Sequence, residues 1–236
     1  MDKDIPDLLL NLSASPFTIN KQKQRMSTLK RFILKSKIPV GYCNLVGGQD
    51  ELVFDGKSMF LDSNGKVVSC AKSFHEDFLV SNFPFRRNKR IRINPNINEV
   101  FDALVLGLKD YVLKNGFSKV VIGISGGVDS ALVAAISVKA LGCSNVLGVA
   151  MPSKYNTETS NTLAEKLCVN LGIKLKALPI QELFDLNLNL LHENIFSNLT
   201  WDITEENLQS RIRSNILMAI SNKMNYPHPR PLKKIK

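Results

Sequence analysis

The amino-acid sequence predicts an α/β fold in which a parallel β-sheet is covered by helices. Three apolar runs of strand length, at 120–122, 145–150 and 174–180, alternate with segments of helical length. Neighbouring parallel strands need a long crossover connection, usually a helix, so this alternation is typical of a parallel sheet. With 236 residues and 44% apolar content, the chain is long enough for two modest domains.

The part of the chain before this pattern is predicted to be a separate, smaller unit. Residues 52–61 and 66–71 have the composition of strands and are expected to form a hairpin closed by Asn64-Gly65. Charged and turn-forming residues between Phe83 and Asn98 predict a domain boundary near residue 90. An amphipathic helix is then expected at 97–117, at the start of the second unit.

The first strand of the parallel sheet leads through a glycine-containing turn into an apolar helix. The backbone N–H groups of such a turn, together with the positive end of the helix dipole, favour binding of a pyrophosphate. Gly126 and Gly127 can take positive φ angles and let the backbone approach the ligand, while Ser125 and Ser130 can supply hydroxyl donors. The predicted ATP-binding residues are Gly123, Ile124, Ser125, Gly126, Gly127, Val128, Asp129 and Ser130.

Asp129 is the one acidic residue of this turn. A carboxylate beside a bound pyrophosphate is repelled unless a divalent cation lies between them, so Asp129 is predicted to be a magnesium ligand. The Walker loop and the dinucleotide-binding fingerprint are excluded, because neither spacing of glycines occurs here. The alternative interpretation is an ordinary glycine turn between a strand and a helix.

Two later segments are predicted to border the same crevice. Met151 is expected to end a buried strand, and Pro152 then directs Ser153 and Tyr155 beyond the carboxyl ends of the strands, where α/β sheets bind ligands. A helix is expected to begin near Thr157.

The last long helix is predicted at 206–218, with an apolar face formed by Leu208, Ile212 and Ile216. Thr204 and the acidic residues that follow it favour the start of this helix, because acidic side chains stabilise a helix N-terminus. Trp201 is expected to pack at the entrance of the helix rather than to act in chemistry.

The motif Ser-Gly-Gly-x-Asp-Ser at 125–130 resembles the pyrophosphate loop of ATP-dependent adenylating enzymes, the PP-loop group. Together with Met-Pro-Ser-x-Tyr at 151–155 and Glu-Asn-Leu-Gln-x-Arg-Ile-Arg-x-Asn-x-Leu-Met at 206–218, it makes the chain similar to the NAD synthetase family. The resemblance implies a three-layer parallel sheet of the adenine-nucleotide alpha-hydrolase type, with ATP and Mg²⁺ as cofactors. It also implies that Asn207 and Arg211 bind deamido-NAD, although Arg211 alone could equally be a surface charge of its helix.

An upstream resemblance extends this interpretation. Residues 44–62 are similar to the late part of the nitrilase-type glutaminase domain that precedes the synthetase domain in glutamine-dependent NAD synthetases. The implied organisation is a partial nitrilase-like α/β sandwich domain at 1–90, an incomplete ATP-binding domain at 91–226 and an atypical tail at 227–236. The resemblance also implies that Ser15 and Lys21 bind glutamine; the alternative is a strand-to-helix turn with a solvated lysine.

No catalytic residue is predicted in this chain. The Glu, Lys and Cys triad of nitrilase-type glutaminases lies upstream of the matching segment, and none of the four cysteines, Cys43 included, has the family's sequence context. We therefore expect the chain to be shortened at both ends relative to the family and unable to hydrolyse glutamine. Three prolines within 227–231 are incompatible with an interior strand, so the tail is expected to arise from a frameshift.

The function implied by the resemblance is ATP-dependent amidation of deamido-NAD to NAD through an adenylated intermediate, with glutamine or ammonia as the nitrogen donor. Two alternatives stay open: a nucleotide-binding remnant without turnover, and an RNA-modifying PP-loop protein. The formal net charge of +10 suits the second, but the basic clusters are scattered and have few interleaved aromatic residues. We therefore expect no nucleic-acid partner.

Composition and spacing limit the remaining classes. The cysteines have no paired spacing, which argues against zinc or a disulfide framework and suits a reducing compartment such as the cytoplasm. No run approaches the length of a membrane span. His75, His192 and His228 lack partners at metal-ligand spacing and are expected at the surface. By family resemblance, a homodimer or higher oligomer is expected.

Overall fold

The computed structural model describes residues 5–85, 98–195 and 200–227. These residues form two compact units, Met1–Tyr111 and Val112–Lys236. The predicted boundary near residue 90 lies outside the described residues and stays a prediction. The units divide further along, within α2 (Asn98–Lys114), because most of this helix contacts the first unit. For example, the carboxylate of Asp110 accepts a hydrogen bond from the Gly48 N–H at 2.7 Å.

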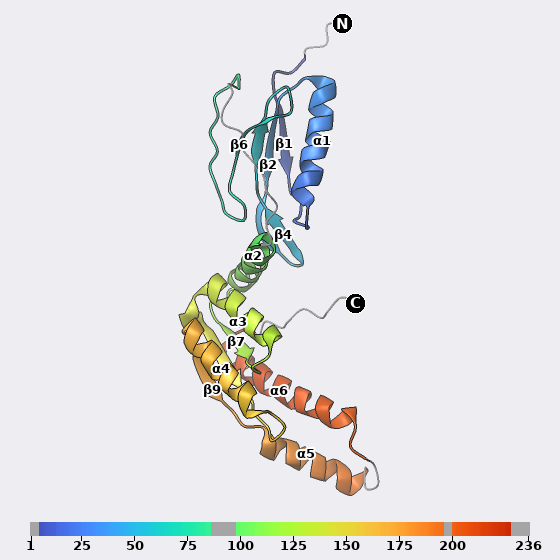
Figure 1. The fold of residues 1–236 in the computed structure, drawn as a ribbon, viewed down its shortest axis with the longest axis vertical. Helices are drawn as coiled ribbons and strands as arrows, with labels where there is room; N and C mark the ends of the chain where they lie inside the picture. The colour runs from blue at the N-terminus through green and yellow to red at the C-terminus, as the bar shows by residue number, and fades with distance from the viewer. Residues whose placement is uncertain (1–4, 86–97, 196–199, 228–236) are drawn as a thin grey trace. The chain divides into compact units, whose positions relative to one another are not determined.

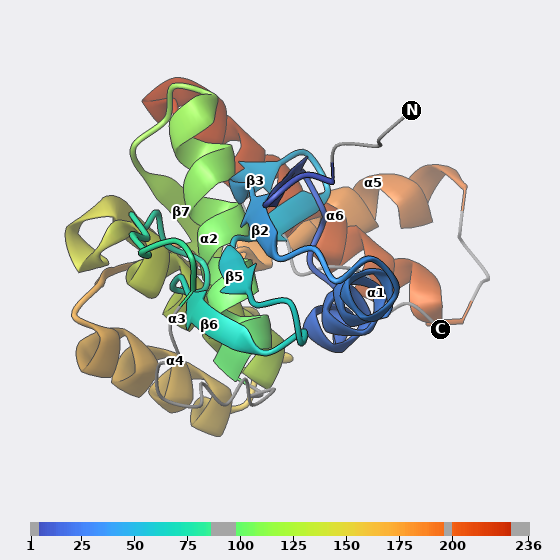
Figure 2. The same ribbon diagram turned by 90° about the horizontal axis from the view of Figure 1, so that it is seen from above.

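The first unit contains a four-stranded mixed sheet with the order β1-β2-β5-β6. Strands β1 (Leu9–Ser13) and β2 (Val40–Asn44) are parallel and are joined by α1 (Lys21–Ser36), as Figure 1 shows. Strand β5 (Met59–Leu61) pairs antiparallel with β2, and β6 (Val67–Cys70) pairs antiparallel with β5. The core lies between α1 and the sheet and contains Leu29, Ile33, Val40, Tyr42, Met59 and Leu61. In Figure 2, α1 is seen nearly along its axis.

The predicted hairpin is confirmed in part. β5 and β6 pair around a turn that contains Asn64 and Gly65. The expected strand 52–61, however, is two strands. Gly56 and Lys57 have φ angles of 64° and 54°, which an extended strand does not allow, so the chain turns between them. The first piece, β4 (Leu52–Asp55), instead pairs with β3 (Val46–Gln49) as a separate hairpin.

The second unit contains the predicted parallel sheet. Strands β7 (Val120–Gly123), β8 (Val146–Ala150) and β9 (Lys174–Ala177) lie in this order, with α3 (Val128–Leu141) and α4 (Glu158–Leu171) as crossovers. A 3₁₀ turn, Cys143–Asn145, joins α3 to β8. The third strand ends three residues before its expected end, although the N–H groups of Leu178 and Ile180 still bond to the carbonyls of Ala150 and Pro152.

Helices cover both faces of this sheet, which makes the unit three-layered. α3 and α4 pack on one face, and Cys168 of α4 reaches Gly148 of β8. α5 (Gln181–Asn194) and α6 (Ile203–Met224) run alongside each other and pack on the other face (Figure 1). The core on that face consists of Val121, Val149, Met151, Ile180, Phe184, Ile212 and Leu217. Leu208 and Ile216 pack against it, which confirms the predicted apolar face of α6.

Two helix ends differ from their predictions. α6 begins at Ile203, and its N-cap is Asp202 rather than Thr204: the Asp202 carboxylate accepts from the Thr204 N–H at 2.7 Å, and Glu205 completes a capping box. α2 ends at Lys114 instead of 117, because Gly116 has a φ of 78°.

The remaining expectations concern cysteines and membranes. All four cysteines are free. In the described part of the chain, no helix has both the length and the apolar character that crossing a bilayer requires. Of the expected tail, residues 228–236 lie outside the described residues, whereas the Pro227 carbonyl accepts a hydrogen bond from Val121 of β7 at 3.2 Å.

Candidate functional site

The predicted phosphate turn lies at the carboxyl end of β7. Gly123 is the last residue of this strand, and α3 begins at Val128 with Gly127 as its N-cap. Because Gly127 has no side chain, it cannot cap the first N–H groups of the helix, which are the groups that an anionic ligand uses. The turn therefore has the strand-to-helix geometry expected from the sequence.

Gly126 is the residue of this turn that must be glycine. Its φ is 79°, in the left-handed region, and a Cβ atom at this position would collide with the backbone carbonyl of Ser160 in the first turn of α4, at 2.9 Å from the carbonyl carbon. Gly127, which could also take a positive φ, has a φ of −86°. The N-cap position requires extended backbone, so only one of the two glycines is left-handed.

The two serine side chains of the turn are bonded to the turn itself. The Ser130 hydroxyl donates to the Gly127 carbonyl at 2.9 Å and accepts from the Ser125 N–H at 3.3 Å. The Ser125 hydroxyl accepts from the Gly127 N–H at 3.3 Å, and the two hydroxyl oxygens are 3.2 Å apart. These bonds hold the turn in shape around the open N–H groups.

Asp129 lies in the first turn of α3 and its side chain is exposed. Among the described residues, no group of three His, Cys, Asp or Glu side chains is arranged to hold a metal ion. Magnesium usually takes one or two carboxylates, with phosphate oxygens and water supplying the other ligands. A single exposed carboxylate beside open phosphate-binding N–H groups fits that mode.

A polar cluster links the chain after β8 to α6. Arg213 of α6 donates from Nε to the Met151 carbonyl at 3.1 Å and from Nη2 to Asn156 Oδ1 at 3.2 Å. Ser153 donates its hydroxyl to Gln209 Oε1 at 2.9 Å, and its N–H to Asn156 Oδ1 at 3.0 Å. Burial lowers the pKa of the Arg213 guanidinium from its ordinary value. The sequence analysis did not predict a role for Asn156, Gln209 or Arg213. The spacing of Gln209 and Arg213, one helical turn apart, was the signal that could have indicated a shared polar face.

The predicted deamido-NAD residues lie on the same helix. Asn207 and Arg211 are both exposed and stand one turn apart, on a different face from Gln209 and Arg213. Tyr155, expected in the crevice, packs against Trp201 with ring centroids 5.3 Å apart. Trp201 also contacts Phe184 at 6.0 Å, which confirms its predicted packing at the entrance of α6.

The predicted glutamine residues belong to the first unit. Ser15 follows β1, and its hydroxyl accepts from Nε of Arg25 at 3.1 Å, while its carbonyl accepts from Nη2 at 2.7 Å. Its N–H donates to Asn44 Oδ1 at 2.9 Å. Lys21 begins α1 and is half-buried. Ser15 is thus hydrogen-bonded to Arg25 and Asn44 of the same unit, and the sequence analysis did not predict these contacts.

Arg25 is held by a buried charge cluster. Its Nη1 lies 2.7 Å from Oδ1 of Asp55, and both side chains are almost fully buried. Lys57 lies 3.9 Å from the other Asp55 oxygen and 2.7 Å from Glu99 of α2. Paired charges of this kind fix the turn that carries Ser15, because a buried charge without a partner is costly.

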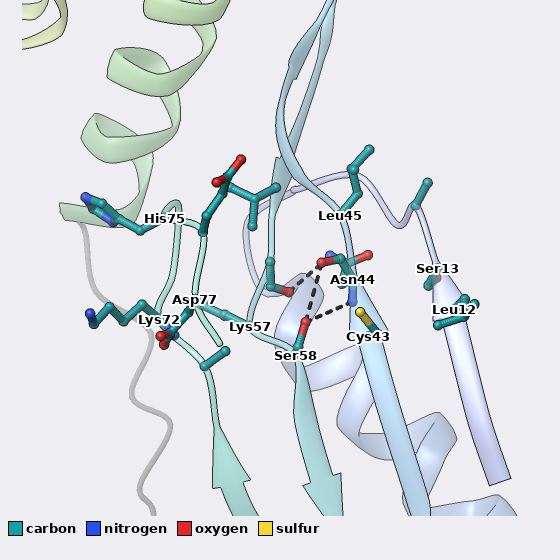
Figure 3. Close-up of a pocket in the computed structure, with 15 residues that line it drawn as sticks. Leu12, Ser13, Cys43, Asn44, Leu45, Lys57, Ser58, Lys72, His75 and Asp77 are labelled. Carbon is teal, nitrogen blue, oxygen red and sulfur yellow. Dashed lines mark hydrogen bonds between the residues drawn. The ribbon is translucent and has the colours of Figure 1, made fainter. Parts of the chain in front are cut away.

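An open cavity of about 570 Å³ lies beside this turn (Figure 3). Asn44 and Ser58 line it, and the Ser58 hydroxyl accepts from the Asn44 N–H at 3.0 Å. Cys43 also borders the cavity and is exposed, but it has no histidine or carboxylate hydrogen-bonded to its thiol among the described residues. The expectation that Cys43 is not a nucleophile stays a prediction.

Comparison with known proteins decides the family. A family model described as NAD synthase matches residues 100–227. The chain belongs to the NAD synthase family. The glutamine-dependent NAD(+) synthetase of Thermotoga maritima is 42% identical over 93% of this chain and 44% of that protein. The corresponding protein of Aquifex aeolicus is 40% identical over 93% of this chain and 45% of that protein.

A solved structure shows the same likeness in three dimensions. The glutamine-dependent NAD+ synthetase from Acinetobacter baumannii, in complex with adenosine diphosphate, matches with a TM-score of 0.87 at 34% identity. The match covers 94% of this chain and 43% of that chain. This member of the NAD synthase family thus spans about half the length of the curated relatives it matches. The predicted family and α/β fold class are confirmed.

Proposed function

We propose that this chain takes part in the ATP-dependent amidation of deamido-NAD to NAD, with glutamine or ammonia as the nitrogen donor. The observation that carries the proposal is the turn between β7 and α3, where a left-handed Gly126 and an uncapped helix N-terminus leave N–H groups open to a pyrophosphate. Membership of the NAD synthase family supports the choice of substrate.

The proposed reaction has two steps. A carboxylate oxygen of deamido-NAD attacks the α-phosphorus of ATP, so that pyrophosphate leaves and the carboxylate becomes an acyl adenylate. Ammonia then attacks the acyl carbon, AMP leaves with the carboxylate oxygen, and one proton is released. Adenylation is needed because a carboxylate oxygen is a poor leaving group and AMP is a good one.

The proposed roles follow the positions of the residues. Residues Gly123–Ser130 form the pyrophosphate site, in which the open N–H groups at the start of α3 donate to the phosphate oxygens. Asp129 would hold Mg²⁺, which would neutralise charge on the departing phosphate oxygens. Asn207 and Arg211 bind deamido-NAD from the exposed face of α6. Their exposure supports this proposal, since neither side chain is used in packing.

We assign 1–90 to a nitrilase-like part and 91–226 to the ATP-binding part of this proposed enzyme. Ser15 and Lys21 contribute to glutamine binding in the first part. Since Arg25 already bonds the Ser15 hydroxyl, Ser15 acts chiefly by shaping the turn. The free cysteines support a reducing, cytoplasmic setting. We also propose a homodimer or higher oligomer.

Calorimetry and a product assay test the proposal on the purified chain. We expect Mg-ATP to bind, and pyrophosphate to be released when deamido-NAD and ammonium chloride are added; glutamine replaces ammonium in a parallel reaction. Binding without pyrophosphate release would favour a nucleotide-binding protein without turnover. Absence of Mg-ATP binding would contradict the assignment of the turn itself.

A further inference from the structure

The segment 153–156 follows β8 and is fastened to two helices. Its Ser153 and Asn156 side chains bond to Gln209 and Arg213 of α6. On the other side, the Lys154 N–H donates to Gln181 Oε1 of α5 at 2.8 Å. The segment is a turn in which the Asn156 N–H donates to the Ser153 carbonyl at 3.0 Å, and side chains from α5 and α6 fasten this turn to both helices.

Arg213 is the member of this cluster that reaches the most partners. Its guanidinium donates to the Met151 carbonyl, Asn156 Oδ1, Gln209 Oε1 and, at 3.5 Å, the Ser153 hydroxyl. All four acceptors are neutral, and no carboxylate of the described ranges forms an ion pair with Arg213. The side chain thus donates several hydrogen bonds from its planar guanidinium and carries a positive charge that no carboxylate of the described residues pairs with.

Arg213 lies at the same edge of the sheet as the proposed nucleotide turn. Leu217 lies one turn beyond Arg213 on α6 and packs beside Gly123, the last residue of β7: a Cβ atom added to Gly123 would come within 3.0 Å of the Leu217 side chain. The Met151 side chain lies beside the same glycine. Arg213 bonds the carbonyl of that Met151. The guanidinium therefore lies at the carboxyl edge of the sheet, the edge from which the Gly123–Ser130 turn leaves.

We propose that Arg213 is a positioning residue that fixes the segment 153–156 against α6 and so shapes the wall of the nucleotide crevice. Its bonds to Met151 and Asn156 hold Tyr155 in its packed place on Trp201. Its unneutralised charge makes the crevice more favourable for an anionic ligand. The effect on ligand affinity rests on the proposed function; the effect on the segment does not.

The chain contains a built-in reporter for the segment, because Trp201 is its only tryptophan and contacts Tyr155. In Arg213→Gln we expect acrylamide to quench Trp201 more strongly, and Mg-ATP to bind about tenfold more weakly, the range for losing hydrogen bonds to a charged group. Arg213→Lys should show the same raised quenching as Arg213→Gln, since one ammonium group cannot reach four separated acceptors, but it should keep part of the Mg-ATP affinity because it keeps the positive charge. The matched control, Lys223→Gln, removes an exposed positive charge from the same helix and should change neither readout.

Asn156→Ala removes the side-chain oxygen of the segment that accepts from Arg213, and it serves as a second test if Arg213→Gln does not fold. It should also raise quenching of Trp201. The proposal would be overturned if the quenching of Trp201 in Asn156→Ala and in the folded Arg213 variants equalled that in the unmodified chain. It would also be overturned if Arg213→Lys matched the unmodified chain in both quenching and Mg-ATP affinity. Raised quenching with a lower unfolding temperature but unaltered Mg-ATP affinity would reduce Arg213 to a structural role. If the unmodified chain binds no Mg-ATP while quenching responds as expected, the proposed function fails and the fixing of the segment stands.

Discussion

Replacing Gly126 with alanine tests how the turn is built. At a φ of 79°, any L residue pays strain of about 1–2 kcal/mol. The new Cβ would also collide with the Ser160 backbone, which lies in α4 and cannot rotate away as a side chain can. Forcing an extra methyl group into packed surroundings adds roughly 1–3 kcal/mol. We therefore expect a total destabilisation of about 2–5 kcal/mol for the second unit.

The matched control is Gly116→Ala, which separates strain from collision. Gly116 has a φ of 78°, but a Cβ there meets no atom within 4 Å. It should lose only about 1–2 kcal/mol. Urea unfolding followed through Trp201 gives both values, and calorimetry with Mg-ATP shows whether the shifted turn still binds. If Gly126→Ala matches Gly116→Ala in stability and keeps Mg-ATP affinity, the contact between the turn and α4 does not constrain the site.

Three further changes test other parts of the structure. Asp129→Asn should weaken Mg-ATP binding roughly tenfold, because an amide is a poorer magnesium ligand, and should strengthen metal-free ATP binding, because it removes a charge that repels the phosphates; a magnesium titration by calorimetry with identical affinities would reject Asp129. Arg25→Ala should destabilise the first unit by about 3–5 kcal/mol in urea unfolding, since it leaves Asp55 buried without its 2.7 Å partner; a loss below about 1 kcal/mol would show that the pair is replaceable. Hydrogen bonds from Thr204 lower the pKa of the Asp202 cap, so its contribution is complete above the unfolded pKa and is lost as pH falls through the folded value. Trp201 emission should report this loss in the unmodified chain and not in Asp202→Asn; identical acid transitions would contradict it.

Sequence reasoning succeeded where the determining forces are local. The turn from β7 into α3 follows from the spacing of glycines and apolar residues, and the buried face of α6 follows from its helical period. The sequence analysis failed where the backbone conformation of a residue depends on contacts with residues far away in the chain. The split of 52–61 at Gly56 and Lys57 was not predicted, because Lys57 adopts a positive φ while its amine is paired with Glu99 from α2.

The sequence by itself therefore determined the α/β class, the alternation of the three parallel strands with two crossover helices in the second unit, and the identity of the candidate phosphate turn, but it did not predict α5. Only the tertiary structure decided that Gly126 admits no side chain, because the Ser160 backbone that crowds it comes from another helix. Tertiary structure likewise joined Ser15 to Arg25 and brought Arg213 to Met151, 62 residues away in the chain. Local propensity acts over one or two turns, whereas such contacts form only when separate elements pack together.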